Sequence, residues 1–361
     1  MKYALIGCGR ISANHIVAAK NNNLDIVGIC DILPENMEDK VRKFEYLKGV
    51  KRYTDYKEML AKEKPDLVAI ATESGKHADI AIDCINSKCN VIIEKPIALS
   101  IADAKRVVEA GEQNGVKVCA CHQNRFNKSI KKIHEALEMG RFGRLLYATA
   151  NIRWSRDYEY YNRAKWRGTW EQDGGALMNQ CIHDIDLLRW LMGDEITEVV
   201  GITDRMKHDY IEAEDLGIAM VRFANGSYGI IEGTTNIYPK NLEETLYIFG
   251  EKGTVKAGGE AVNLIEEWRF SDYLDEPETV KKEYSEVPPN VYGFGHTKLY
   301  ADMLDAIENN KSPLVDGYAG MRAVELVLAI YKSSYTGEKV KLPLSDCSTL
   351  DFSGMFEESE N

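Results

Sequence analysis

Two short motifs in this sequence hold side chains of the kind that enzymes use for proton transfer. The first is Glu94-Lys95-Pro96, which directly follows Asn90–Ile93, an apolar run that indicates a buried strand. Ligands of open parallel sheets bind just beyond the carboxyl ends of the strands. A lysine held there is partly desolvated, which lowers its pKa toward the range useful for proton transfer. The motif therefore predicts a catalytic Lys95, whereas an isolated Glu-Lys-Pro is more often a solvated charge pair.

The second motif is a helix that begins at Gly174-Gly175 and carries Asn179 and His183. These two residues are four apart, so they share one helix face, and Asp186 follows three residues later. A single histidine on such a face is usually a core residue. Asn179 and the glycine-rich entry favour a functional His183 instead.

A glycine turn near the N-terminus indicates a site for a dinucleotide. Gly7-Cys8-Gly9-Arg10-Ile11-Ser12 follows an apolar strand at residues 2–6 and precedes a helix that extends to about residue 21. The first glycine permits the tight turn, and the second lets the main chain approach a pyrophosphate at the helix N-terminus. Ser12 replaces the usual third glycine or alanine and is small enough for close helix–strand packing.

The next strand indicates which dinucleotide is bound. Residues 25–30 form an apolar run that ends at Asp31, 22 residues beyond Gly9. An acid at this place accepts hydrogen bonds from ribose hydroxyls and repels a 2′-phosphate. No Arg or Lys stands beside it, so NAD is favoured over NADP. The alternative is an aspartate that only forms the turn before Leu33-Pro34.

Strands and helices alternate through the first third of the chain, as in a doubly wound parallel sheet. Further strands are predicted at 66–71, 90–93 and 116–121, with helices at 78–87 and 100–114. The segments Thr72–His77 and Glu94–Pro96 would then lie over the cofactor. This predicts a Rossmann domain over residues 1–122.

The chain becomes rich in strands after about residue 195. Alternating patterns predict strands at 198–202, 216–223, 227–234, 244–249 and 254–256, and helices at about 296–309 and 319–335. We therefore expect an α+β domain over residues 123–345 with a large, mostly antiparallel, open-faced sheet, followed by a frayed acidic tail at 346–361.

Composition excludes several other classes of protein. The chain has 361 residues and a net charge of −12, which leaves no general excess of Lys and Arg for nucleic acid. No apolar stretch reaches the roughly 18 to 20 residues that cross a membrane, and the start enters a strand at once, unlike a signal peptide. The eight cysteines lack Cys-x-x-Cys spacing, so we expect reduced thiols, no metal site and a cytoplasmic location.

With these features the chain resembles the glucose–fructose oxidoreductase / inositol dehydrogenase (Gfo/Idh/MocA) family. The resemblance covers residues 2 to about 343. The matching residues are Gly7-x-Gly9, Asp31, Glu94-Lys95-Pro96, and Gly174-Gly175 with His183-Asp184-Ile185-Asp186. The resemblance implies an NAD-dependent dehydrogenase acting on CH–OH groups. It also implies that Lys95 is catalytic, that Glu94 contacts the nicotinamide ribose, and that the open sheet face is buried in a homodimer or homotetramer.

Asn179 departs from the family, which usually has aspartate at this position. An amide cannot take a proton, so Asn179 can only orient a substrate through hydrogen bonds. Proton abstraction then belongs to His183 or Lys95. We favour His183 as the base, with Lys95 holding the hydroxyl oxygen, and the opposite assignment stays open.

A basic and aromatic stretch at residues 153–170 indicates an anionic substrate. Five of its first fifteen residues are basic, although the whole chain is acidic. Arginine forms bidentate contacts with phosphate or carboxylate, and the alternative is a solvated loop paired with Asp157 and Glu159. With Gln123–Asn127, this stretch resembles the family branch that oxidises the 3-hydroxyl of UDP-N-acetylglucosaminuronate in bacterial glycan biosynthesis, and Asn179 matches that branch.

These patterns and the resemblance give a full set of expected site residues. The catalytic pair is Lys95 and His183. The expected substrate contacts are Asn179, Arg156, Tyr161, Arg163, Arg167, Gln123 and Arg125. The expected cofactor contacts are Gly7, Gly9, Arg10, Ile11, Asp31, Thr72, His77, Glu94, Lys95, Gln123 and Trp166. The alternatives are a dehydrogenase of a free cyclitol or simple sugar and a non-enzymic dinucleotide sensor.

Overall fold

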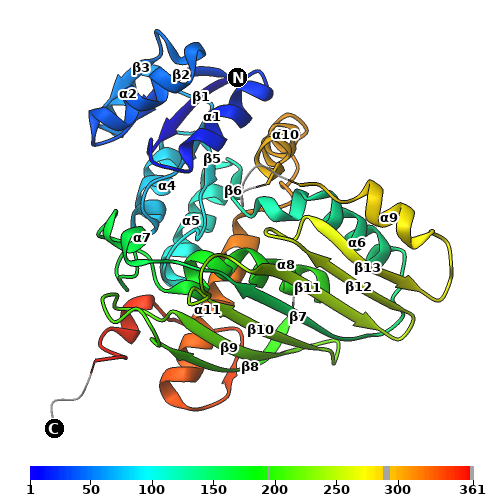
Figure 1. Ribbon diagram of the computed structural model, residues 1–361. Helices are drawn as coiled ribbons and strands as arrows, with labels where there is room; N and C mark the ends of the chain where they lie inside the picture. The colour runs from blue at the N-terminus through cyan, green and yellow to red at the C-terminus, as the bar shows by residue number, and fades with distance from the viewer. Residues whose placement is uncertain (194, 288–292, 358–361) are drawn as a thin grey trace. The chain divides into compact units, whose positions relative to one another are not determined.

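The computed structural model describes residues 1–193, 195–287 and 293–357, which belong to two compact units (Figure 1). The first unit combines Met1–His122 with His296–Met321, and the second combines Gln123–Gly295 with the chain from Arg322 onward. The continuous second domain expected over 123–345 is therefore interrupted. Residues 296–321 pack with the first unit because Thr297 and Tyr300 form hydrogen bonds with Asn22 and Tyr3 there.

The first unit holds a six-stranded sheet in the order β3-β2-β1-β4-β5-β6, with every pairing parallel. Its strands are β1 Lys2–Ile6, β2 Asp25–Cys30, β3 Lys51–Tyr53, β4 Leu67–Ile70, β5 Asn90–Ile93 and β6 Val118–Ala120. Strand order reverses between β1 and β4, which is where doubly wound sheets bind ligands. The predicted Rossmann sheet is confirmed. The short β3 was missed because its sequence, Lys-Arg-Tyr, has no apolar run.

Helices follow most of these strands. They are α1 Ser12–Asn21, α2 Pro34–Lys43, α3 Tyr56–Glu63, α4 His77–Asn86, α5 Ile101–Asn114 and, returning from far along the chain, α10 Gly295–Glu308. Helix α5 shows how the sequence sets the ends. Ser100 Oγ accepts a hydrogen bond from the Asp103 N–H, and Gly115 ends the helix in the left-handed conformation.

The second unit holds an eight-stranded sheet in the order β13-β12-β11-β7-β10-β9-β8-β14. Its strands are β7 Leu145–Arg153, β8 Ile196–Asp204, β9 Leu216–Phe223, β10 Tyr228–Thr234, β11 Glu243–Gly250, β12 Gly253–Gly258, β13 Leu264–Phe270 and β14 Val340–Lys341. Among the described residues β7 and β10 pair in parallel and the other pairings are antiparallel. The mostly antiparallel sheet is confirmed, and β7, β13 and β14 were not predicted.

One face of this sheet is covered by helices. The helices of the unit are α6 Lys128–Glu138, α7 Tyr158–Asn162, α8 Ile182–Met192, α9 Pro277–Glu283 and α11 Gly317–Thr336, which begins in the first unit. Helix α8 packs on β7, β10 and β11 (Figure 1). Gly217 and Gly233 permit close packing of the segment just before α8, because a Cβ at either would lie 2.5 or 2.8 Å from the Leu177 side chain.

The opposite face of the sheet exposes a continuous apolar patch. Along β8, β9 and β10 alternate residues are buried and exposed. Ile202 pairs with Ile218, and Met220 pairs with both Val200 and Ile230, so these exposed side chains are neighbours. We call these five residues the sheet patch.

The C-terminal segment is ordered as far as it is described, contrary to the expected frayed tail. Residues Thr349–Phe352 form a short 3-10 helix with a capping box between Ser348 and Asp351. Phe352 is buried against Trp170 and Tyr331. Phe352 is thus an apolar anchor within an acidic segment, which explains why the segment is packed rather than frayed. Residues 358–361 lie outside the described part. Within that part, no helix combines the length and apolar character needed to span a membrane.

Candidate functional site

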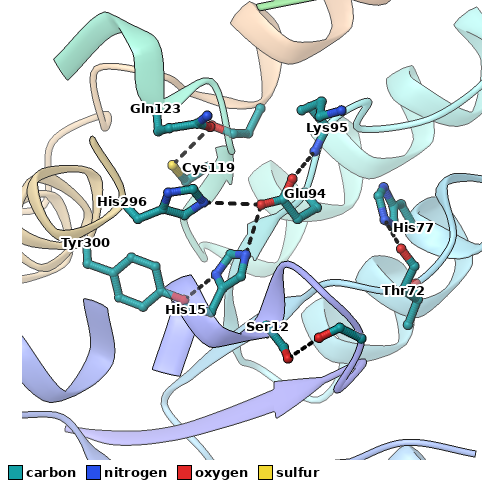
Figure 2. Close-up of polar contacts among 12 residues, drawn as sticks. Ser12, His15, Thr72, His77, Glu94, Lys95, Cys119, Gln123, His296 and Tyr300 are labelled. Atoms are coloured by element: carbon teal, nitrogen blue, oxygen red, sulfur yellow. Dashed lines mark hydrogen bonds and ion pairs between the residues drawn. The ribbon is translucent and has the colours of Figure 1, made fainter. Parts of the chain in front are cut away.

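The glycine turn has the geometry that a dinucleotide pyrophosphate requires. Gly7 adopts φ +91°, and a Cβ there would lie 2.4 Å from the Ala71 carbonyl oxygen. A Cβ at Gly9 would meet nothing within 4 Å, so the space beside it is open. Ser12 Oγ donates a 2.6 Å hydrogen bond to the Gly9 carbonyl and fixes the turn at the start of α1 (Figure 2). Arg10 is exposed and Ile11 is half-buried. The turn fits the expected cofactor.

Asp31 is fixed beside this turn by three hydrogen bonds. Its Oδ2 accepts a 2.7 Å hydrogen bond from the Cys8 N–H, and its Oδ1 accepts hydrogen bonds from Leu33 N and Asn36 Nδ2. The aspartate therefore shapes the following turn and also holds a half-buried carboxylate next to the glycine turn. The turn-forming interpretation of Asp31 is confirmed. The contact with ribose hydroxyls, which its remaining lone pairs suit, stays a prediction.

His77 joins the ends of β4 and β5. Its Nδ1 lies 2.7 Å from the Pro96 carbonyl oxygen and its Nε2 lies 3.1 Å from the Thr72 carbonyl oxygen. Burial lowers the pKa of His77, so a neutral ring donates to one of the two carbonyls. The ring is almost wholly buried, so it holds the two segments together rather than facing a ligand.

The carboxylate of Glu94 is buried, whereas the adjacent Lys95 is half-buried. Glu94 Oε1 accepts a 2.9 Å hydrogen bond from His15 Nε2, and Oε2 accepts a 3.2 Å hydrogen bond from the Lys95 main-chain N–H (Figure 2). Burial alone would raise the pKa of Glu94, but hydrogen bonds from His15 and His296 outweigh it and hold this pKa well below its usual range. Glu94 is therefore ionised.

In the second unit, Asn179 lies on a π-helix rather than on the regular helix that its spacing predicts. The π-turn spans Leu177–Cys181, and α8 begins at Ile182. Such turns are frequent at functional sites. The Asn179 amide nitrogen donates to the Asp173 carboxylate, and His183 Nε2 lies 3.4 Å from Gln123 Nε2.

A buried carboxyl group supports the π-turn. Glu214 Oε1 accepts hydrogen bonds from Leu177 N at 2.7 Å and from the Tyr331 hydroxyl at 2.9 Å. Its Oε2 fills the space beside Gly175, where a Cβ would lie 1.6 Å from it. Burial raises the pKa of Glu214 to about 8, so the group is protonated at neutral pH.

The basic residues separate into two groups. Arg125 is buried in a bidentate ion pair with Asp186, with its Nε 2.7 Å from Asp186 Oδ2, so it holds α8 in place instead of binding substrate. Arg163 forms an exposed pair with Glu159, as the solvated-loop alternative predicts. Tyr161 is buried with its hydroxyl 3.2 Å from Thr235 Oγ1. The expectation that these three residues contact substrate is not supported.

Arg156 and Arg167 form the second group, around the ring of Tyr160. Their guanidinium carbons lie 4.9 and 4.2 Å from the Tyr160 ring centroid. The Tyr160 hydroxyl accepts a 3.0 Å hydrogen bond from Gln180, the neighbour of Asn179. Both arginines and Trp166 are half-buried. We call Arg156, Tyr160 and Arg167 the arginine cluster.

Sequence reasoning missed several members of the site. Asp173, Gln180 and Glu214 contact the π-turn or the arginine cluster, and His15 and His296 contact Glu94. Residues that are distant in sequence meet only in the fold, so no motif marks them. The exceptions are Asp173, which directly precedes Gly174-Gly175, and Gln180, which follows Asn179 in the same motif.

Substituting each glycine of the turn should separate folding from cofactor binding. We expect Gly9→Ala to keep the melting temperature within a few degrees but to weaken NAD binding at least about tenfold, because the added methyl occupies the open space. Gly7→Ala should destabilise the protein through its φ and the clash with Ala71. Calorimetric titration with NAD measures the affinity of each variant, and thermal melts measure its stability. Equal NAD affinity of Gly9→Ala and wild type would contradict the assignment of Gly9 to the cofactor site.

Glu214→Gln should change the pH dependence of stability. Between about pH 4.5 and about pH 8 the unfolded chain releases the Glu214 proton while the folded chain keeps it, so wild-type stability falls as pH rises through this window. Glutamine does not titrate, so the variant lacks this pH-dependent loss of stability. We expect the variant to gain on the order of 3 kcal/mol relative to wild type between about pH 5 and about pH 8.5. Urea unfolding at the two pH values measures the free energies of unfolding. The same difference between variant and wild type at both pH values would refute the prediction.

Comparisons with known proteins agree with this geometry. The profile of the oxidoreductase family NAD-binding Rossmann fold matches residues 1–122, and that of the family's C-terminal alpha/beta domain matches residues 134–342. Myo-inositol 2-dehydrogenase of Thermotoga maritima is 28% identical over 350 residues, covering 90% of this chain and 96% of the relative.

Solved structures show a stronger similarity. The WlbA dehydrogenase of Bordetella pertussis, crystallised with NADH and UDP-GlcNAcA, is 39% identical with a TM-score of 0.89, covering 96% of this chain and 98% of that one. The WlbA dehydrogenase of Chromobacterium violaceum, with the same two ligands, is 36% identical with a TM-score of 0.86 and covers 96% of each chain. The protein is thus an NAD-dependent sugar-type dehydrogenase, and it belongs to the Gfo/Idh/MocA oxidoreductase family.

Proposed function

We propose that this protein oxidises the 3-hydroxyl of UDP-N-acetylglucosaminuronate to the 3-keto sugar, with NAD, in bacterial glycan biosynthesis. The arginine cluster carries the proposal, because an acidic protein has concentrated half-buried guanidinium groups beside the helix of Asn179 and His183. The similarity to two WlbA dehydrogenases crystallised with UDP-GlcNAcA supports it.

The charges of the substrate suit the cluster. A UDP-uronate carries a pyrophosphate and a carboxylate, both of which arginine binds in bidentate fashion. Arg156 and Arg167 donate to the main-chain carbonyls of Ser155 and Tyr160, which orient them. The Nε of each is buried without a hydrogen-bond partner among the described residues, so neither guanidinium has all of its donors satisfied there. An uncharged polyol would leave these donors unpaired.

The catalytic step needs a base and a group that holds the reacting oxygen. We assign proton abstraction to His183, whose Nε2 faces the Gln123 amide, and positioning of the hydroxyl oxygen to Lys95. When bound, NAD accepts the hydride that leaves C3. Asn179 orients the sugar through its amide oxygen, because the amide nitrogen donates to Asp173. Gln123 contacts the His183 ring at Nε2 and helps to orient it.

The substrate assignment predicts which arginines matter. We expect UDP-N-acetylglucosaminuronate to reduce NAD far faster than myo-inositol or glucose. Arg156→Gln and Arg167→Gln should each raise KM for the UDP-sugar about 10- to 100-fold, as expected when a charged hydrogen bond is lost. Arg163→Gln is the matched control and should leave KM unchanged, because its side chain is paired with Glu159 at the surface. The measurement is NADH absorbance under steady state.

Two results would overturn this proposal. Turnover of a free polyol without turnover of the UDP-sugar would favour the cyclitol or simple-sugar alternative. The similarity to myo-inositol 2-dehydrogenase is the reason for testing that alternative. Full turnover by Lys95→Ala would remove the catalytic assignment.

We also propose that the sheet patch is the interface between copies of this chain in a homodimer or homotetramer. Ile202, Ile218 and Met220 are 71%, 50% and 51% exposed, and an exposed apolar patch that spans three strands commonly marks a protein interface. Its residues lie in register on neighbouring strands, so they form one continuous surface, which a two-fold symmetric pair of chains would bury on both partners.

Charging this patch should dissociate the assembly. We expect the double variant Ile218→Lys/Ile230→Lys to elute as a smaller species, because lysine side chains placed across the interface repel one another. Met139→Lys is the control, since Met139 is 66% exposed just beyond α6 and away from the patch. Light scattering after size-exclusion chromatography measures the masses, and an unchanged mass of the double variant would exclude the patch as the interface.

A further inference from the structure

A buried chain of polar side chains ends at the carboxylate of Glu94. It starts at Tyr3 on β1 and continues to Tyr300 on α10, whose hydroxyl lies 3.0 Å from that of Tyr3. The Tyr300 hydroxyl lies 2.7 Å from Nδ1 of His15 on α1, and His15 leads to Glu94 (Figure 2). The N-terminal elements, α10 and the Glu-Lys-Pro motif are distant in sequence, and this chain of side chains joins all three.

The ionised acceptor sets the direction of the hydrogen bond at Glu94. An ionised Glu94 can only accept, so His15 Nε2 carries the hydrogen. The hydroxyls of Tyr300 and Tyr3 can each donate or accept, so they continue the chain from His15 Nδ1 in either direction. Burial raises the pKa of both tyrosines, which keeps them as donors. Each group from Tyr3 to Glu94 is satisfied by the next.

His296 completes the surroundings of the carboxylate. Its Nε2 lies 3.5 Å from Glu94 Oε1, and its ring packs edge-on against His15 at 5.3 Å between centroids. Burial lowers the pKa of His296. The groups that face Glu94 are therefore His15 from α1, His296 from α10, the thiol of Cys121 after β6, and the main chain of Lys95.

We propose that His15 and His296 are positioning residues for catalysis: they fix the Glu94 carboxylate, whose second oxygen holds the main chain of Lys95. The inference rests on the proposed catalytic role of Lys95. Because α1 also begins at the glycine turn, the same imidazole links the cofactor-binding helix to the lysine. Burying an ionised carboxylate is unfavourable unless hydrogen bonds offset the lost solvation, which explains why several donors surround Glu94.

The two imidazoles, the carboxylate and the thiol of Cys121 could also serve as metal ligands, since their ligand atoms lie within 4.8 Å of one another. Two observations favour the hydrogen-bonded arrangement. His15 Nε2 lies at hydrogen-bond distance from Glu94, and burial raises the pKa of Cys121 well above its usual range, so the thiol is kept neutral. Metal analysis of the purified protein decides between them.

The test compares variants that remove or retain the donor to Glu94. His15→Leu should lower kcat about 10- to 100-fold, as small displacements of catalytic groups do, and change KM for the sugar less than about threefold. It should also move the acidic limb of the kcat–pH profile to higher pH. Without its donor, burial raises the pKa of Glu94, so activity is lost as the pH falls through that raised pKa. His15→Gln retains an N–H and should recover most of kcat.

A second set of variants guards against misfolding. Glu94→Gln should abolish the shifted acidic limb of the kcat–pH profile, and His296→Leu should reproduce a weaker form of the His15→Leu effect. His134 lies on α6 in the other unit, so His134→Leu should change neither kcat nor the kcat–pH profile. Nitrogen-15 NMR of labelled histidines should show a hydrogen on His15 Nε2, a readout that does not depend on activity.

The possible outcomes separate this inference from the proposed function. Unchanged kcat and pH profile in a folded His15→Leu, or one equivalent of zinc that Cys121→Ser removes, would overturn the positioning role. If the wild type oxidises another sugar, the variants are assayed on that sugar and the inference stands or falls separately. If Lys95→Ala keeps full turnover, the catalytic assignment fails even when the NMR result is as expected.

Discussion

The first unit depends on one buried negative charge, the carboxylate of Glu94. A carboxylate that leaves water must recover its lost solvation from hydrogen bonds. Here the donors come from α1, from α10 and from the main chain of the next residue. Satisfying this charge therefore fixes the end of β5 relative to both helices. The half-buried lysine beside it is held by a rigid main chain while its side chain keeps access to solvent.

The second unit uses a buried acid in a different ionisation state. Glu214 is protonated at neutral pH, and it accepts hydrogen bonds from the first π-turn N–H and from Tyr331. Gly175 leaves the space that this carboxyl group needs. The glycine pair of the motif thus makes room for a supporting acid, which in turn holds the turn that carries Asn179. Both conspicuous motifs rest on a buried carboxyl group: Glu94 is a member of its own motif, whereas Glu214 comes from elsewhere in the fold.

The arginines show why local charge is an incomplete guide to binding. Arg125, Arg156, Arg163 and Arg167 are equivalent in the sequence, yet their surroundings differ. Arg125 is neutralised by Asp186 inside the unit and Arg163 by Glu159 in solvent. Arg156 and Arg167 instead contact aromatic faces and carbonyl oxygens, which leaves their charge uncompensated by these contacts. A guanidinium charge without a carboxylate partner is the kind that can bind the anionic sugar that we propose as substrate.

The sequence by itself determined the Rossmann unit, the preference for NAD, and the two motifs with Lys95 and His183. These features depend on local chemistry: an apolar run of strand length, a glycine that must adopt positive φ, and a charged residue at a strand end. Periodicity likewise revealed strands β8 to β12 of the antiparallel sheet, but not β7, β13 or the two-residue β14. In the parallel sheet it missed the three-residue β3.

Only the tertiary structure decided what surrounds the motifs. His15, His296 and Tyr300 show no periodic or spacing signal that links them to Glu94, because α10 returns to the first unit after the chain has built a second one. The ion pair of Arg125 and the burial of Tyr161 are equally invisible in a single sequence. The physical reason is common to all of them: the energy of a buried polar group is set by which distant partners reach it, and that depends on packing.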